Sequence, residues 1–133
     1  MANIATMAGV SDVHHIRKHD VESWHDLLCE TFSQTAYMPI PTAPFSGELS
    51  HCAHGPARMS RIHSSAGRFL RSPQKIRADN FDGYNILLSL RGNLRLSQSD
   101  KALQARFGEA LVYRYGAPFE LEFPEEYWAV SLW

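Results

Sequence analysis

The first regular pattern of hydrophobic and polar residues is helical and lies near the N-terminus. Apolar residues recur there at steps of three and four, and so share one face of a helix: Val21, Trp24, Leu27 and Leu28. Asp20 is a suitable N-cap, because its carboxylate can accept a hydrogen bond from the first turn. We therefore predict one amphipathic helix over about residues 20–32. Residues 1–19 show no clear period, and we expect a flexible leader there.

After Gly47 the hydrophobic pattern changes to a period of two. Apolar residues alternate with Glu120 and Glu122, for example, which is typical of a strand with one buried and one solvated face. Glycines and prolines interrupt the chain at short intervals, and Gly92-Asn93 suits a tight hairpin turn. The segments between them amount to about eight or nine strands. Since no helix is indicated between strands, we predict an antiparallel sandwich or barrel.

One segment fits this alternation poorly. In Ala57–Ser64 neither set of alternate residues is purely apolar, because Met59 and Arg61 share one face while Ile62 lies with serines on the other. The segment can be an edge strand with two solvated faces. It can also be a strand that lines a ligand cavity and brings polar groups to it. The sequence leaves both interpretations open.

The composition indicates one domain and argues against a nucleic-acid surface. The chain has 133 residues, 44% hydrophobic and 20% charged, which is enough for one domain with a real core. Its 13 basic residues are balanced by 14 acidic ones, whereas nucleic-acid binders cluster Lys and Arg. No apolar run reaches the ~20 residues of a membrane helix, and no secretory signal opens the sequence. We therefore expect a cytoplasmic protein with reduced cysteines and no membrane contact.

Several short motifs resemble those of a known family in their order and spacing. They are Trp24 with Leu27 and Leu28, Phe45–Leu49, Arg71–Ile76 ahead of Asp82-Gly83-Tyr84, the hairpin at Gly92 ending at Gln98, and Phe107-Gly108-Glu109. Over about residues 22–133 the chain resembles the cupin-like sensor domain of AraC-type transcription regulators. That family usually has Pro-Gly-Asp at the last motif, where Glu109 can occupy the same acidic turn position.

The resemblance implies a fold, a function and partners. The fold is all-β with one N-terminal helix: a cupin-like antiparallel β-barrel, or double-stranded β-helix, with the barrel over about 48–133 in a sensor domain over 20–133. Such domains bind a small-molecule effector or contribute to dimerisation, so the resemblance implies an effector that shifts the population between two arrangements and allows a homodimer. These regulators bind DNA through a separate C-terminal helix-turn-helix half. We expect no DNA-binding domain in this chain.

Metal-dependent cupin enzymes are the main alternative. Their barrels bring a His-x-His pair, a Glu and a further His to one ion, but this chain has no histidine after His63. A stand-alone enzyme would need a metal site among His51, His54 and His63. We therefore expect no catalytic residue, no metal ligand and no cofactor. This enzyme and a ligand-free dimerisation module remain the two alternatives to effector sensing.

The effector site should lie inside the barrel. The alternation of the Tyr84–Arg91 segment predicts that Ile86 and Leu88 face inward, and two tyrosines bring hydroxyl groups that need partners if they are buried. We predict ligand contacts from Met59, Arg61, Ile86, Leu88, Tyr113, Tyr115 and Phe119. Plain core packing by the same residues is the competing interpretation, because small barrels are either filled by side chains or hold one small ligand.

Overall fold

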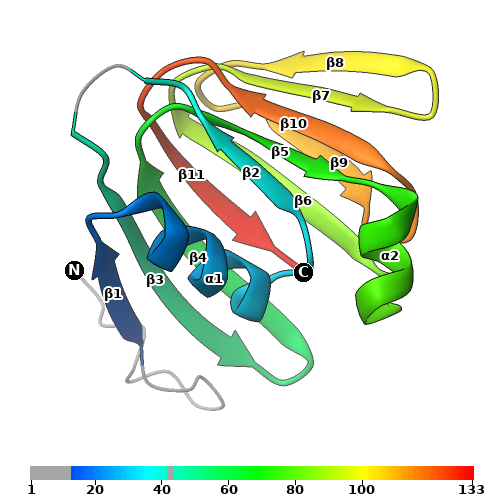
Figure 1. Ribbon diagram of the computed structural model, residues 1–133, viewed down its shortest axis with the longest axis horizontal. Helices are drawn as coiled ribbons and strands as arrows, with labels where there is room; N and C mark the ends of the chain where they lie inside the picture. The colour runs from blue at the N-terminus through cyan, green and yellow to red at the C-terminus, as the bar shows by residue number, and fades with distance from the viewer. Residues whose placement is uncertain (1–12, 42–43) are drawn as a thin grey trace.

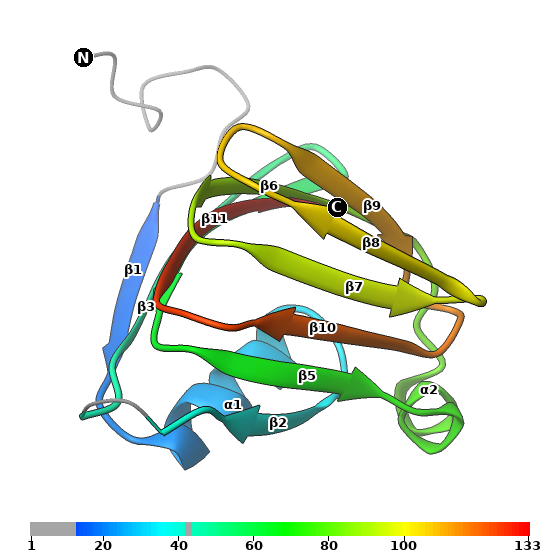
Figure 2. The same ribbon diagram turned by 90° about the horizontal axis from the view of Figure 1, so that it is seen from above.

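The computed structural model describes residues 13–41 and 44–133, which form two antiparallel sheets and two helices (Figures 1 and 2). The strands are β1 (His14–Lys18), β2 (Ala36–Pro39), β3 (Gly47–His54), β4 (Ala57–Ser64), β5 (Gly67–Arg71), β6 (Tyr84–Arg91), β7 (Leu94–Gln98), β8 (Lys101–Ala105), β9 (Ala110–Arg114), β10 (Phe119–Phe123) and β11 (Tyr127–Leu132). The helices are α1 (Val21–Thr31) and α2 (Pro73–Asp79). The predicted all-β class is therefore confirmed.

The two sheets lie face to face as a sandwich. One has six strands in the order β1-β3-β4-β11-β6-β9, and the other has five in the order β2-β5-β10-β7-β8. Strand β9 belongs to the six-stranded sheet, β10 to the five-stranded sheet and β11 again to the six-stranded sheet. The chain therefore crosses between the sheets after β9 and again after β10, at the ends of these strands (Figure 2). The cupin-like topology is confirmed, but the described strands form a jelly-roll-like sandwich in place of the closed barrel that we predicted.

Helix α1 begins and ends close to where the sequence pattern places it. Asp20 caps it, because the carboxylate accepts a hydrogen bond from the Ser23 backbone N–H at 2.8 Å. Trp24 and Leu28 form its buried face, and the helix closes the side of the sandwich next to the edge strands β1 and β2 (Figure 2). Among the described residues, neither helix is long and apolar enough to span a membrane.

Trp24 connects α1 to the start of β3. The indole is fully buried, and a Cβ atom built on Gly47 would lie 2.5 Å from it. Because real Cβ atoms do not come this close to other heavy atoms, only glycine leaves room for the ring. Two motifs of the sequence analysis, the Trp-bearing helix and the glycine after Phe45, thus meet at one contact.

The N-terminal prediction needs a correction. Residues 13–19 of the expected flexible leader are described, and His14–Lys18 forms β1, which pairs with β3. An ion pair between Arg17 and Glu48 joins the two strands. The segment shows no period because this edge strand is largely exposed, so burial does not select apolar residues there. The rest of the predicted leader, residues 1–12, lies outside the described residues.

Two further elements differ from the expectations. The interpretation of Ala57–Ser64 as an edge strand is wrong, since β4 lies between β3 and β11 and buries Ser60, Ile62 and Ser64. Helix α2 was not predicted, because none of its residues is buried and it therefore carries no apolar period. Its start is nevertheless capped, with Ser72 Oγ accepting a hydrogen bond from the Lys75 N–H at 3.3 Å.

Candidate functional site

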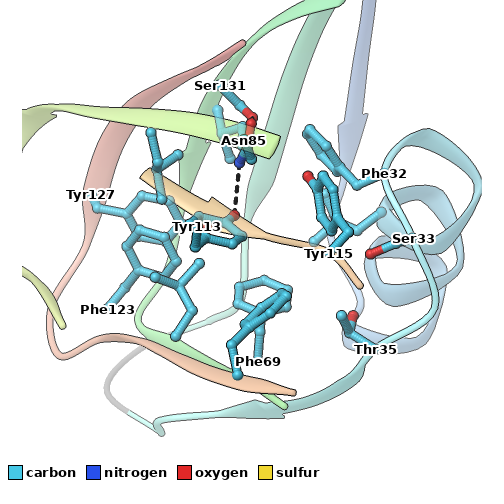
Figure 3. Close-up of a pocket in the computed structure, with 15 residues that line it drawn as sticks. Phe32, Ser33, Thr35, Phe69, Asn85, Tyr113, Tyr115, Phe123, Tyr127 and Ser131 are labelled. Atoms are coloured by element: carbon cyan, nitrogen blue, oxygen red, sulfur yellow. Dashed lines mark hydrogen bonds between the residues drawn. The ribbon is translucent and has the colours of Figure 1, made fainter. Parts of the chain in front are cut away.

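A cavity of about 50 Å³ lies between the two sheets, next to the C-terminal end of α1 (Figure 3). The helix end, the six-stranded sheet and the five-stranded sheet each contribute walls, among them Leu28 and Phe32, Leu87 and Tyr113, and Phe119 and Phe123. The lining is mostly aromatic and aliphatic, and none of the described residues that form it carries a charged side chain. Such a site favours apolar groups over ions.

Three aromatic rings form the centre of the lining. The ring centroid of Tyr113 lies 4.8 Å from that of Phe119 and 5.8 Å from that of Tyr115. All three side chains are buried. Tyr113 near the end of β9 and Tyr115 just after it are two residues apart and are buried on the same side of the chain. Phe119 is the first residue of β10 in the opposite sheet. The turn between these strands therefore brings the rings together across the sandwich.

A small hydrogen-bonded network crosses the cavity wall on the six-stranded sheet. Asn85 in β6 lies opposite Tyr113 in β9, and its Nδ2 donates a hydrogen bond to the Tyr113 hydroxyl at 2.7 Å. Ser131 in β11 donates from Oγ to Asn85 Oδ1 at 2.6 Å. Since buried polar groups are costly without partners, the three residues stabilise one another and fix the orientation of the Tyr113 ring.

Burial keeps the tyrosine hydroxyls of the cavity protonated. Desolvation raises the pKa of Tyr113 to about 12, although the hydrogen bond from Asn85 acts in the opposite direction. Desolvation likewise raises the pKa values of Tyr115 and Tyr127 above the ordinary value of 10.0. The walls of the cavity are therefore uncharged at neutral pH.

The segment between α1 and β2 forms the wall nearest the helix. Ser33 in this segment is 5% exposed and lines the cavity. Within the described part of the chain, its Oγ has no hydrogen-bond partner, and Figure 3 shows this oxygen directed toward the cavity. The neighbouring Phe32 is half-buried and packs on Trp133, with ring centroids 4.7 Å apart.

Arg71 anchors the same segment from behind. Its guanidinium is fully buried and donates to both carboxylate oxygens of Asp79, at 2.8 and 2.9 Å. It also donates to the backbone oxygens of Tyr115, Gln34 and Phe81, at 2.7, 2.8 and 3.0 Å. The Asp79 carboxylate in turn accepts from the Gln34 N–H at 2.8 Å. This set of contacts, which we call the Arg71 clamp, joins α2 to the turn after β9 and to the segment beside Ser33.

Comparison with known proteins identifies the family. The sequence profile of the AraC-binding-like domain family matches residues 24–133. The chain belongs to this family. The expectation of an AraC-type sensor domain, which the motif order suggested, is therefore confirmed.

Two AraC-type activators illustrate how this AraC-binding-like domain relates to longer proteins. The transcriptional activator NphR from a Rhodococcus species is 30% identical over 98 residues, which are 74% of this chain and 28% of NphR. The crystal structure of the AraC-like transcriptional activator CuxR superposes with a TM-score of 0.78 at 16% identity, over 91% of this chain and 46% of CuxR. The chain thus spans less than half the length of either activator.

A more distant structure shares the fold. An ethanolamine utilization protein Q from Salmonella typhimurium matches with a TM-score of 0.50 and 12% identity, over 75% of this chain and 94% of that protein. At this level of identity the match concerns the fold only. The fold of this AraC-binding-like domain is therefore also found outside regulators.

The structure brings together three of the seven predicted ligand contacts. Tyr113, Tyr115 and Phe119 line the cavity as expected. The other four, Met59, Arg61, Ile86 and Leu88, lie outside the cavity and on the outer face of the six-stranded sheet.

The wrong parity in β6 has a physical reason. The alternation predicts Ile86 and Leu88 inward because their side of the strand is the more apolar one, but the strand buries Asn85, Leu87 and Ser89. Asn85 is satisfied by residues far away in the sequence, Tyr113 and Ser131, whereas Ser89 bonds the nearby backbone oxygen of Gly92. The register with β9 would have corrected the parity, because Tyr113 lies opposite Asn85. That pairing skips β7 and β8, so it is not visible from neighbouring segments.

In β4, too, the side chains that we predicted to face inward lie on the outer face of the sheet. Arg61 is exposed and lies over the Trp128 ring, with Cζ 5.6 Å from the centroid. Met59 pairs with Leu132 of β11, which in turn pairs with Ile86 of β6. The inward parity instead presents Ile62 to the cavity, so β4 does line it, as one of the two sequence interpretations proposed.

The early histidines do not gather into a metal site. His51 Nδ1 lies 2.8 Å from Ser60 Oγ, His54 is exposed at the end of β3, and His63 stacks on Trp128 with centroids 3.9 Å apart. In the described ranges, no group of three or more His, Cys, Asp or Glu is arranged to hold a metal ion. The metal-dependent alternative therefore has no candidate ligand set among the described residues.

Twelve of the fifteen residues that line the cavity were not predicted as ligand contacts, and four of these are small polar residues. Ser33, Thr35, Asn85 and Ser131 line the cavity, and each is a small polar residue that a strand or loop carries just as often on its surface. Asn85 gives the one usable signal, since a polar residue amid the apolar segment Tyr84–Leu90 needs a buried partner if it faces inward. For Ser33 the sequence offers no such signal.

Proposed function

We propose that this AraC-binding-like domain binds a small-molecule effector in the cavity between its two sheets, as the sensor of a longer transcription regulator. The observation that carries the proposal is an incompletely filled interior whose lining includes an unpartnered hydroxyl, Ser33 Oγ. A merely structural core would fill this space and satisfy the hydroxyl. No covalent change of the effector is required, so we assign the domain no enzymatic role. In a cytoplasmic regulator, DNA would be bound by another part of the protein.

The cavity volume limits what can bind without rearrangement. Pockets for drug-sized ligands measure about 300–1,000 Å³, and about 150 Å³ accommodates benzene in an apolar cavity. The 50 Å³ seen here admits only a few non-hydrogen atoms. An effector the size of one ring therefore requires the wall at Phe32 to move outward. The wall can move at Phe32, whose side chain is only half-buried at the end of α1, while the Arg71 clamp holds the following connection at Gln34.

Such a movement gives the effector a way to act on the rest of the regulator. Phe32 packs on Trp133, and Trp133 pairs its backbone with Arg58 through hydrogen bonds of 2.7 and 3.0 Å. An effector that binds only when Phe32 has moved stabilises the arrangement with an altered Phe32–Trp133 contact. The response is then a shift between two populations, whose size is set by the difference in effector affinity.

A pair of adjacent leucines tests the cavity. Leu87 is 2% exposed and lines it, whereas Leu88 faces the opposite side of the same strand. Leu87→Phe fills the cavity, and Leu88→Phe makes the same chemical change on the outer face. Thermal-shift screening of a panel of small metabolites should find compounds that raise the Tm of the wild type and Leu88→Phe but not of Leu87→Phe. Equal shifts in all three proteins, or none in any, would contradict the proposal.

We also propose that the domain forms a homodimer through the outer face of the six-stranded sheet. Leu132, Ile86 and Val112 pair across three neighbouring strands, and their exposed fractions are 41%, 42% and 55%. A continuous exposed apolar row of this kind is typical of an association surface. Sedimentation velocity should detect a dimer that Ile86→Ser weakens. The control is Leu103→Ser, which makes a similar change at an exposed leucine on β8, in the other sheet. A monomer at all concentrations refutes the dimer and leaves effector binding untouched.

A further inference from the structure

We infer that the effector is a small uncharged molecule, largely apolar, whose polar group forms a hydrogen bond with Ser33 Oγ. The inference rests on the proposed function and specifies the chemistry of the same cavity. Three features of the structure carry it: the uncharged lining, the fully occupied donors of Arg71, and a buried lining hydroxyl, Ser33 Oγ, that lacks a partner among the described residues.

The lining disfavours an ionised effector. Aromatic and aliphatic side chains make up most of the walls, and the tyrosines among them stay protonated because burial raises their pKa values. An anion moved into such a site loses its hydration and finds no opposite charge on the lining residues. The cost of this transfer amounts to several orders of magnitude in affinity.

Arg71 is a buried cation that contacts the backbone of the lining residue Tyr115, but it has no donor to offer. A guanidinium has five N–H groups. Those of Arg71 are directed to five acceptors: the backbone oxygens of Tyr115, Gln34 and Phe81, and the two carboxylate oxygens of Asp79. The charge is also neutralised by Asp79. A carboxylate or phosphate on an effector would therefore have to break the Arg71 clamp before Arg71 could bind it.

The polar groups of the cavity divide into used and unused ones. Asn85, Tyr113 and Ser131 hydrogen-bond among themselves, so they hold the wall in place. Ser33 Oγ is buried, faces the cavity and has no partner in the described chain (Figure 3). A buried hydroxyl without a partner is unfavourable. A hydroxyl, carbonyl or amide on the effector would satisfy it, and we therefore expect the ligand class to carry such a group.

Three compounds of similar size separate the possibilities. Benzyl alcohol carries a hydroxyl, toluene carries no polar group, and benzoate carries a negative charge. We would measure the Kd of each by NMR titration with the wild type, with Ser33→Ala and with Ser50→Ala, a control on β3 whose hydroxyl bonds His15 away from the cavity. Ser33→Ala should raise the Kd of benzyl alcohol about three- to tenfold and leave the Kd of toluene unchanged. Benzoate should bind more than about a hundredfold more weakly than benzyl alcohol.

The outcomes distinguish this inference from the proposed function. Benzoate binding as tightly as benzyl alcohol overturns the uncharged class while the cavity remains a binding site. Equal losses for benzyl alcohol and toluene in Ser33→Ala overturn the role of Ser33. No binding of any compound to the wild type overturns the inference, whereas the thermal-shift screen of metabolites with Leu87→Phe and Leu88→Phe decides separately on the proposed function. The Tm of ligand-free Ser33→Ala should not fall, because the hydroxyl it removes has no partner; a clear fall would show a structural role and overturn the inference.

Discussion

Replacement of Arg71 by methionine should strongly destabilise the domain. Methionine retains an unbranched apolar stem but removes all five N–H donors of the guanidinium. Three backbone oxygens, those of Tyr115, Gln34 and Phe81, then lose a donor, and the Asp79 carboxylate loses its buried partner. The acceptors belong to three different parts of the chain, so no single local rearrangement restores their hydrogen bonds.

The size of the effect follows from these contacts. Removal of one partner of a buried ion pair costs about 3–5 kcal/mol, because the remaining charge is left without compensation. Domains of this size are stable by only about 5–15 kcal/mol. Arg71→Met should therefore lose a large part of the free energy of unfolding. Arg71→Lys keeps the charge but offers three donors in a different geometry, and it should recover only part of the loss.

Urea unfolding followed by tryptophan fluorescence measures these differences. The matched control is Arg95→Met on the surface of β7, where the guanidinium is 58% exposed and contacts Glu122 at 3.3 Å. An exposed pair of this kind contributes less than about 1 kcal/mol. If Arg71→Met lost no more stability than Arg95→Met, the Arg71 clamp would not hold the segment beside the cavity in the way we argue.

The pH dependence gives an independent measure of the same contacts. Burial raises the pKa of Asp79, but hydrogen bonds from Arg71 and from the N–H groups of Gln34 and Phe81 outweigh it and lower the pKa from 3.8 to about 2. The stabilisation from the ionised carboxylate is complete above pH 3.8 and is lost as the pH falls toward 2. After allowance for solvent screening this amounts to about 1–2 kcal/mol. In Arg71→Met, the free energy of unfolding measured by urea should therefore fall less between pH 3.8 and 2 than in the wild type.

Three further changes test other contacts. Gly47→Ala places a Cβ against the buried Trp24 ring and should lower the stability by about 1–3 kcal/mol, measured from the Tm. Asn85→Leu leaves the hydroxyl groups of Tyr113 and Ser131 without their partner and should cost about 1–3 kcal/mol in urea unfolding. The Tyr113 hydroxyl loses its proton near pH 12 in the folded state but near 10 when unfolded. Stability should therefore fall between these values, and less steeply in Tyr113→Phe, as followed by tyrosinate absorbance and circular dichroism.

The sequence predicted those elements whose pattern depends on local burial. Helix α1 has one apolar face against a core, and its cap at Asp20 is formed within the helix itself. The strand Phe119–Phe123 alternates strictly, because its outward side carries glutamates that pair with arginines of neighbouring strands. Helix α2 and strand β1 escaped prediction since neither buries enough side chain to create a period. The local pattern therefore predicted the elements that pack one face against the core, and it missed the elements that lie largely exposed on the surface.

The interior of the six-stranded sheet could not be predicted in the same way. Its inner face contains Asn85, Ser60, Ser89 and Ser131, all nearly inaccessible to solvent. Ser89 finds its partner nearby, in the backbone oxygen of Gly92, but Asn85 depends on Tyr113 and Ser131 from strands that are distant in the sequence. An assignment of parity by counting apolar residues must fail there. Local sequence therefore gives the right orientation for Tyr113, Tyr115 and Phe119 but the wrong one for the β6 residues of the cavity, Asn85 and Leu87.

The motifs that revealed the family are, in the structure, contacts that hold the fold. Gly47 makes room for Trp24, and Arg71 forms the clamp with Asp79. Each contact depends on the particular side chains that make it, so its sequence signature is narrow and recognisable. The cavity lining has no such requirement: many combinations of apolar and small polar residues can enclose 50 Å³. Family membership therefore identifies the frame around the cavity, whereas the effector chemistry that we propose depends on Ser33 Oγ, which lies outside these motifs.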